Sequence, residues 1–199
     1  MNPLVLADDD SELPEVLTDL LETGGVLVFP TDTVYGIGGN PWDLPAVRRV
    51  RRLKGRAADR PFALLLPATN GIETFADVSG GTGDRVRDLL PGPITVIVRA
   101  TGEGVPPAVI QDGKVGIRVP DHPFFSGVMR RVGRPLFGTS ANRSGDPPLC
   151  DIDRILEAFH VVDLVVTSDV PPSGIASTVI DLTCEPPRAL RGVLPRALR

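Results

Sequence analysis

Short apolar stretches alternate along the chain with segments whose apolar residues recur at helical spacing. The pattern predicts helices over residues 13–23, 44–54, 84–90, 122–132 and 151–159. It predicts strands over residues 26–29, 62–66, 94–99, 115–119, 136–138, 161–166, 178–182 and 188–190. This mixture is typical of an α/β protein, whose ligands usually lie in loops beyond the strand ends. Since no repeat or linker separates two cores, we expect one domain over residues 1–199, with a twisted, mostly mixed sheet flanked by helices.

The composition argues against several classes of protein. Of the 199 residues, 42% are apolar and 23% are charged, which does not fit a disordered chain. Apolar runs such as residues 63–66 are far shorter than a membrane-spanning helix requires. The N-terminus lacks the pattern of a secretory signal, and Cys150 and Cys184 form neither a disulfide framework nor a metal motif. We therefore expect a cytoplasmic protein with no membrane contact and no metal ligands of its own.

Positive charge is concentrated in one segment, although the formal net charge is −4. Seven of the 21 Lys and Arg residues lie between positions 48 and 60, against a single acid. This clustering indicates a local anion site. Lys54 falls on the apolar stripe of the predicted helix, so its ammonium is expected to face the body of the protein. It is either a ligand for a polyphosphate or an ordinary C-terminal lysine that complements the helix dipole.

Small polar side chains follow or precede several predicted strands. Residues 29–36 place two threonines, an aspartate and a tyrosine directly after a buried strand. Similar stretches lie at 91–95, 116–120, 137–145 and 173–181. Each is either a ligand-binding loop or simply a turn. Arg118, within an apolar strand, needs an anionic partner, which is either a ligand or a structural ion pair.

Familiar catalytic motifs are missing. The sequence has no P-loop, no convincing dinucleotide-binding fingerprint and no zinc-protease motif. Residues 138–142 fail the nucleophile-elbow pattern, and only His122 and His160 are available as a histidine base. A serine hydrolase is therefore not expected.

Six motifs, taken together and in order, resemble the YrdC-like family of threonylcarbamoyl-AMP synthases. They are Pro-Thr-Asp-Thr-Val-Tyr-Gly at 30–36, Lys-x-Arg at 54–56, Pro-Gly-Pro-x-Thr at 91–95, Arg-Val-Pro at 118–120, Ser-Ala-Asn-x-Ser-Gly at 140–145, and Ser-Thr-Val-x-Asp at 177–181. The resemblance implies the YrdC-like fold in its short, single-domain form. It also implies an enzyme that makes L-threonylcarbamoyladenylate and pyrophosphate from L-threonine, bicarbonate or CO2, and ATP with Mg²⁺.

The family motifs also imply roles for individual residues. Lys54, Arg56, Ser140 and Asn142 form the catalytic signature. Threonine would be bound by Thr33, Arg118 and Ser177, and ATP by Lys54, Arg56, Thr95, Ser140, Asn142 and Arg191. The product would serve N6-threonylcarbamoyladenosine formation at position 37 of tRNA, with the tRNA threonylcarbamoyl transferase proteins as downstream partners and contact with tRNA itself. On this basis we expect Lys54→Ala to abolish most activity with little effect on thermal stability.

The chain departs from the family pattern at Ala57, Arg60 and Leu65, where members often carry Pro, Asn and His, and Arg191 is followed directly by Gly192. The alternative hypothesis is a YrdC-like module that binds tRNA or double-stranded RNA without synthase activity. Such a module would spread its cations over a wide face and offer aromatic rings for stacking. Here the cations are clustered, and the aromatics are one Trp, one Tyr and seven Phe, which favours the enzyme.

Overall fold

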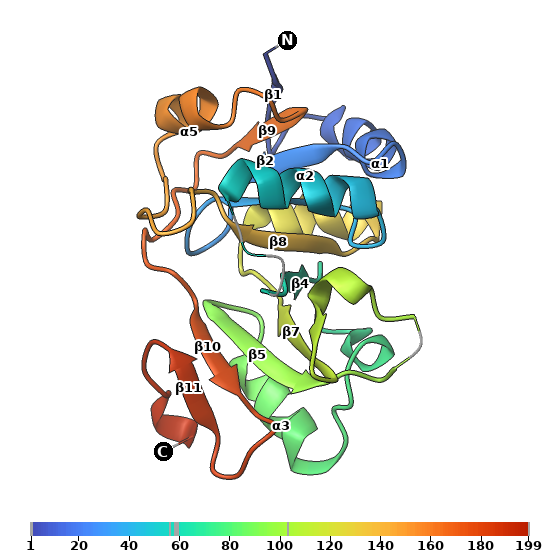
Figure 1. The fold of residues 1–199 in the computed structure, drawn as a ribbon, viewed down its shortest axis with the longest axis vertical. Helices are drawn as coiled ribbons and strands as arrows, with labels where there is room; N and C mark the ends of the chain where they lie inside the picture. Colours follow the sequence, from blue (N-terminus) through green and yellow to red (C-terminus); the bar gives the residue numbers. More distant parts are fainter. Residues whose placement is uncertain (1, 56, 58–59, 103, 199) are drawn as a thin grey trace.

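A single mixed sheet forms the centre of the protein in the computed structural model, which describes residues 2–55, 57, 60–102 and 104–198 (Figure 1). The strand order is β1-β9-β2-β3-β8-β4-β7-β5-β10-β11, and β6 pairs with β7. The strands are β1 Leu4–Ala7, β2 Val26–Phe29, β3 Gly36–Gly39, β4 Ala63–Leu65, β5 Ile94–Arg99, β6 Ile110–Gln111, β7 Lys114–Arg118, β8 Leu136–Ser140, β9 Leu164–Thr167, β10 Thr178–Asp181 and β11 Arg188–Arg191. Parallel pairs such as β4/β7 alternate with antiparallel pairs such as β4/β8, so the prediction of a mixed sheet is confirmed.

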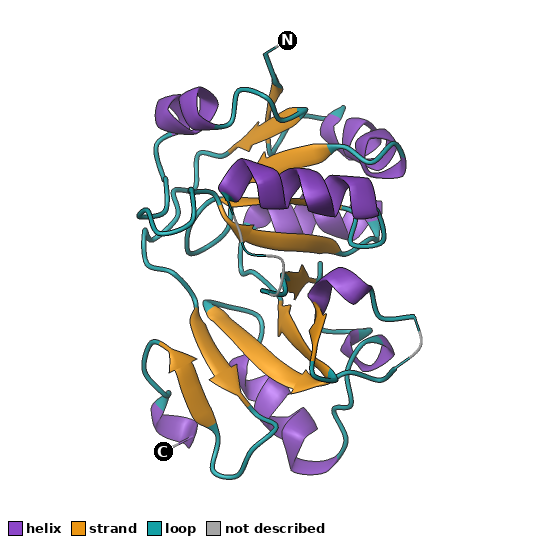
Figure 2. Cartoon of the chain, in the orientation of Figure 1, coloured by secondary structure: helices purple, strands orange, loops and turns teal. Residues whose placement is uncertain are grey.

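Helices cover both faces of the sheet (Figure 2). They are α1 Leu13–Glu22, α2 Leu44–Lys54, α3 Gly80–Leu89, α4 Arg130–Val132 and α5 Ile152–Ala158, with the π-helix η3 Phe124–Met129 and the short 3-10 helices η1 Ile72–Thr74, η2 Pro107–Val109 and η4 Arg196–Leu198. Leu27 and Phe29 pack in one core with α1 and η3, whereas Val26 and Val28 pack in the other with α2. Because alternate residues of a strand point to opposite faces, β2 contributes to two cores. Within the described residues, we find no helix of the length and apolarity that a membrane crossing requires.

Helix α2 forms where the sequence predicts it. The Asp43 side chain caps its first turn by accepting a hydrogen bond from the Ala46 N–H at 2.6 Å. Gly55 ends it with φ of 59°, a left-handed conformation that glycine adopts readily. Val47 and Val50 are buried, and Lys54 lies on the same face. The expected inward direction of Lys54 is therefore confirmed.

Several elements differ from the sequence prediction. Strands β1, β3 and the two-residue β6 were not predicted, and α3 begins at Gly80, four residues before the expected start. The sequence of β3 is Gly-Ile-Gly-Gly, which has almost no strand propensity. Its glycines are needed because a Cβ on Gly38 would lie 1.8 Å from the Phe137 carbonyl oxygen. Tight packing between β3 and β8 thus overrides local propensity.

A row of residues with little or no side chain crosses the middle of the sheet. Gly38 of β3 pairs with Gly138 of β8, Gly138 pairs with Ala63 of β4, and Ala63 pairs with Gly116 of β7. Four adjacent strands therefore present bare backbone at the same level. We call these four residues the small-residue row; three of them, Gly138, Ala63 and Gly116, line a cavity.

Asp181 at the end of β10 forms an ion pair with Lys114 of β7 at 3.1 Å, and its other oxygen accepts hydrogen bonds from the Thr183 N–H and hydroxyl. Burial acts to raise the pKa of Asp181, but the hydrogen bonds from Thr183 and Lys114 outweigh burial, and the pKa lies below the usual 3.8. The pair joins the two strands that flank β5.

This carboxylate gives a pH-dependent contribution to stability. Because its pKa is lower folded than unfolded, the contribution is present above the unfolded pKa and is lost as pH falls through the folded one. We expect Asp181→Asn to be less stable than wild type at about pH 6, with the difference shrinking as the pH falls to about 2. Denaturant titrations of both proteins at several pH values in this range measure the difference in their free energies of unfolding. A difference that stays constant with pH would contradict the assignment.

Candidate active site

A cavity of about 550 Å³ lies beside the small-residue row. Strand β4, which carries Ala63 of that row, lies midway along the long axis of the molecule in Figure 1. Gly138, Ala63 and Gly116 of that row line the cavity. Of the residues predicted for the site, five also line it: Thr95, Arg118, Ser140, Ser177 and Arg191. They come from β5, β7, β8, the segment before β10, and β11. Segments that are far apart in the sequence therefore converge on one cavity.

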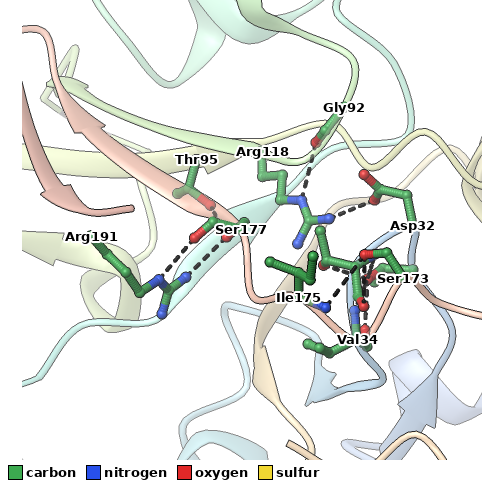
Figure 3. Close-up of polar contacts among 11 residues, drawn as sticks. Asp32, Val34, Gly92, Thr95, Arg118, Ser173, Ile175, Ser177 and Arg191 are labelled. Carbon is green, nitrogen blue, oxygen red and sulfur yellow. Dashed lines mark hydrogen bonds and ion pairs between the residues drawn. The ribbon is translucent and has the colours of Figure 1, made fainter. Parts of the chain in front are cut away.

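Arg118 ends β7 and is held from two sides (Figure 3). Its Nη2 donates to Asp32 Oδ1 at 2.5 Å, and its Nε donates to the Gly92 carbonyl at 3.3 Å. Only 8% of the Arg118 side chain is exposed. Burial lowers the pKa of the guanidinium, the charge and hydrogen bond of Asp32 act to raise it, and the charge of Arg191 lowers it further. Arg118 thus forms an ion pair and faces the cavity at the same time.

Arg191 lies at the other side of Ser177 in Figure 3, and its contacts are neutral. Its Nε donates to the Ser177 carbonyl at 2.8 Å and its Nη2 to the Ser177 hydroxyl at 3.0 Å. The Ser177 and Thr95 hydroxyls share a hydrogen bond of 3.1 Å. Burial lowers the pKa of Arg191. The buried guanidinium of Arg118, the more exposed guanidinium of Arg191 and a pair of hydroxyls give the cavity the donors that an anionic ligand needs.

Thr33 lies behind the cavity wall. Its hydroxyl shares a hydrogen bond of 3.0 Å with that of Thr31, and Thr31 lines the cavity in its place. The backbone of this loop is tied to the segment before β10, since the Ser173 N–H donates to the Asp32 carbonyl and the Gly174 N–H donates to the Thr33 carbonyl. The loop over residues 31–34 and the segment over residues 173–174 are therefore held together by backbone hydrogen bonds.

Lys54 and Asn142 lie together behind Ser140. Lys54 Nζ donates to the Ser140 carbonyl at 2.5 Å, to the Asn142 carbonyl at 2.6 Å and to Asn142 Oδ1 at 3.0 Å. The Ser140 hydroxyl also donates to Asn142 Oδ1, at 2.5 Å. Lys54 is 3% exposed and, like Asn142, does not line the cavity. In this structure the ammonium therefore holds the loop that carries Ser140. Arg56 lies outside the described residues.

Sequence reasoning did not assign Asp32, Thr31, Tyr35, Arg60 or Leu65 to the site. Asp32 pairs with Arg118, and the other four line the cavity. The signal for Asp32 was present, because a buried arginine needs an anion and Asp32 belongs to the first polar loop. Arg60 and Leu65, two of the departures from the family pattern, both face the cavity. Burial raises the pKa of the Tyr35 phenol.

Neither histidine lines the cavity. His122 Nδ1 accepts a hydrogen bond from the Phe124 N–H, and its Nε2 contacts the Val170 carbonyl at 3.2 Å. The described residues also contain no cluster of three His, Cys, Asp or Glu side chains that could hold a metal ion. What the site offers is therefore cationic and hydroxyl donors.

Residues 19–192 match the model of the Sua5_yciO_yrdC family, described as "Telomere recombination". The chain belongs to this family. It is 32% identical over 185 residues to the threonylcarbamoyl-AMP synthase of Pyrococcus abyssi, covering 90% of this chain and 54% of that protein. It is 35% identical over 147 residues to the enzyme of the same name from Dichelobacter nodosus, covering 72% and 76%. The chain thus spans about half the length of the first relative and three quarters of the second.

The crystal structure of Pyrococcus abyssi Sua5 complexed with L-threonine shares the fold. It superposes with a TM-score of 0.85 at 29% sequence identity, covering 96% of this chain and 57% of that chain. The expected YrdC-like architecture is confirmed.

Proposed function

We propose that the protein is an L-threonylcarbamoyladenylate synthase, which forms threonylcarbamoyl-AMP and pyrophosphate from L-threonine, bicarbonate or CO2, and ATP. The names of the relatives support this activity. The observation that carries it here is the placement of Arg118 and Arg191 in one cavity with the Thr95 and Ser177 hydroxyls. Its product would be used for N6-threonylcarbamoyladenosine formation at position 37 of tRNA in the cytoplasm, by tRNA threonylcarbamoyl transferase proteins.

In this proposal the carboxylate of threonine binds the donors of Arg118 that Asp32 and Gly92 leave unused, with Ser177 beside it. Thr31 supplies the cavity-facing hydroxyl, and Thr33 supports it from behind. The ammonium group of threonine loses one proton to solvent, its nitrogen forms a bond to the carbon of CO2, and the nitrogen releases a second proton to solvent, which gives a carbamate. A carbamate oxygen then attacks the α-phosphorus of ATP, the bond to the bridging oxygen of the β-phosphate breaks, and pyrophosphate leaves with the electron pair.

The barrier arises from bringing two anions together. Fixed cations that face the reacting groups lower this repulsion, and positioning supplies much of the remaining rate. Arg118 and Arg191 are such cations. No covalent nucleophile is required. ATP enters as its Mg²⁺ complex, in which the ion offsets phosphate charge; its ligands would be the phosphates and water, since the described residues include no acidic cluster.

We assign ATP contacts to Thr95, Ser140 and Arg191, which line the cavity. Lys54 and Asn142 keep the 140–146 loop in place. Arg56 belongs to the same signature by its position in the sequence. In this assignment, some of the predicted ATP-binding residues contact ATP directly, and others hold the loop that carries Ser140.

The test is an assay of pyrophosphate release with ATP, Mg²⁺, bicarbonate and each amino acid in turn. We expect release that requires both threonine and bicarbonate. RNA binding without turnover would instead support the module hypothesis, which the comparisons do not favour. Release that is independent of bicarbonate would contradict the carbamate step.

A further inference from the structure

Arg118 and Arg191, the two arginines in contact with Ser177 or close to it, differ in how their charge is balanced. Arg118 has a carboxylate partner at 2.5 Å, whereas the contacts of Arg191 within the described residues are the neutral oxygens of Ser177. Arg60 also lines the cavity, and no acidic side chain of the described residues forms an ion pair with it. The charge of Arg118 is therefore balanced by Asp32, whereas no acidic group of the described residues balances that of Arg191, which lies on the other side of Ser177.

Asp32 is the group responsible for this difference. Its side chain is 15% exposed, and Oδ2 is buried without a hydrogen-bond partner in the described structure. Arg118 is consequently the cation that balances the carboxylate. Asp32 is not part of the cavity lining, so it acts on a ligand through Arg118 and through its electric field.

Asp32 also fixes the direction of the guanidinium. One side of Arg118 is held by Asp32 and the Nε side by the Gly92 carbonyl, and Nη1 has no partner in the described residues. These contacts come from the loop after β2 and from the turn before β5, at opposite sides of β7 in the sheet. The unused donors are thereby presented in one orientation to the cavity.

We propose that Asp32 is a positioning residue that orients Arg118 and cancels its charge, so that this end of the cavity accepts a zwitterionic amino acid and excludes phosphate-type anions. A zwitterion adds no net charge to a neutral site, whereas a phosphate adds one or two negative charges beside the Asp32 carboxylate. The inference rests on the proposed function, because it assigns the amino acid to Arg118. Beyond that function, the inference assigns to Asp32 the selection of threonine over ATP phosphates at Arg118.

The test measures inhibition of pyrophosphate release by inorganic phosphate. In wild type we expect phosphate to compete with ATP and not with threonine. In Asp32→Asn, which keeps a hydrogen-bond acceptor but removes the charge, phosphate should also compete with threonine. The phosphate concentration that halves pyrophosphate release at low threonine should be about tenfold lower than in wild type. Asp181→Asn is the matched control, since it removes a buried, cation-paired carboxylate away from the cavity; it should keep the wild-type pattern.

A wild-type inhibition pattern in Asp32→Asn would overturn the proposal. Should that variant fail to fold, Asp32→Ser is the second charge-free variant, with the same expected and contradicting results. If wild type shows no threonine-dependent release, the proposed function fails. Calorimetric titration with inorganic phosphate then tests Asp32 separately, since an additional phosphate site in the charge-free variant supports its role and an unchanged stoichiometry contradicts it.

Discussion

Lys54→Ala is expected to lower the free energy of unfolding by about 3 kcal/mol and to abolish most activity. The ammonium is buried and donates to three oxygens of the 140–142 segment. Removing it leaves those oxygens without their charged donor and opens a gap beneath the loop that carries Ser140. The sequence alone suggested almost unchanged stability. The contacts of Lys54 lead to a different expectation because its partners are protein atoms.

Denaturant unfolding and pyrophosphate release would be measured on Lys54→Ala together with Lys54→Met, which keeps most of the length of the side chain. Methionine should recover part of the lost packing but not the activity, since it has no charge. Arg52→Ala is the matched control, because it removes an exposed cation from the same helix. Inactive variants with wild-type stability would contradict the role of Lys54 in holding the loop and favour direct contact with the ligand.

Arg118→Lys is expected to raise the KM for threonine about a hundredfold, with a much smaller effect on the KM for ATP. Lysine retains the positive charge, so Asp32 keeps an ionic partner and the variant should fold. A single ammonium cannot reproduce the planar set of donors that engages Asp32, the Gly92 carbonyl and a ligand carboxylate together. Alanine is less informative, because it would leave the Asp32 charge buried and unpaired.

Steady-state kinetics with each substrate varied in turn separates the two KM values. Arg134→Lys, at an exposed ion pair with Glu22, is the matched control and should leave both unchanged. An equal rise in the two KM values would show that Arg118 does not distinguish the substrates. An unchanged KM for threonine would place the carboxylate elsewhere.

The sequence predicted correctly those features that depend on residues close together in the chain. Helix α2 follows from its apolar spacing, its aspartate cap and Gly55, and the direction of Lys54 follows from helical geometry. The partners of Lys54 are 86 and 88 residues away in the chain, and no periodicity identifies them. Likewise, Arg118 was expected to need an anion, but only the fold shows that Asp32 supplies it.

Strands β1 and β3 were missed for different reasons. β1 is an edge strand that is largely exposed, so it lacks the apolar alternation of a half-buried strand. β3 is fully buried but consists mainly of glycine, because its neighbours leave no room for side chains. The motif also could not show that Thr31 faces the cavity and Thr33 lies behind it, because the sequence does not distinguish two threonine hydroxyls in the same turn.

Gly138, Ala63 and Gly116 leave the main chain of three neighbouring strands facing the cavity, and the hydrogen bonds of the sheet fix it in place. A peptide plane in a sheet has no rotamers, so this base keeps its shape whichever substrate arrives first. Discrimination between substrates then depends on the side chains around this base, among them Arg118 and Arg191.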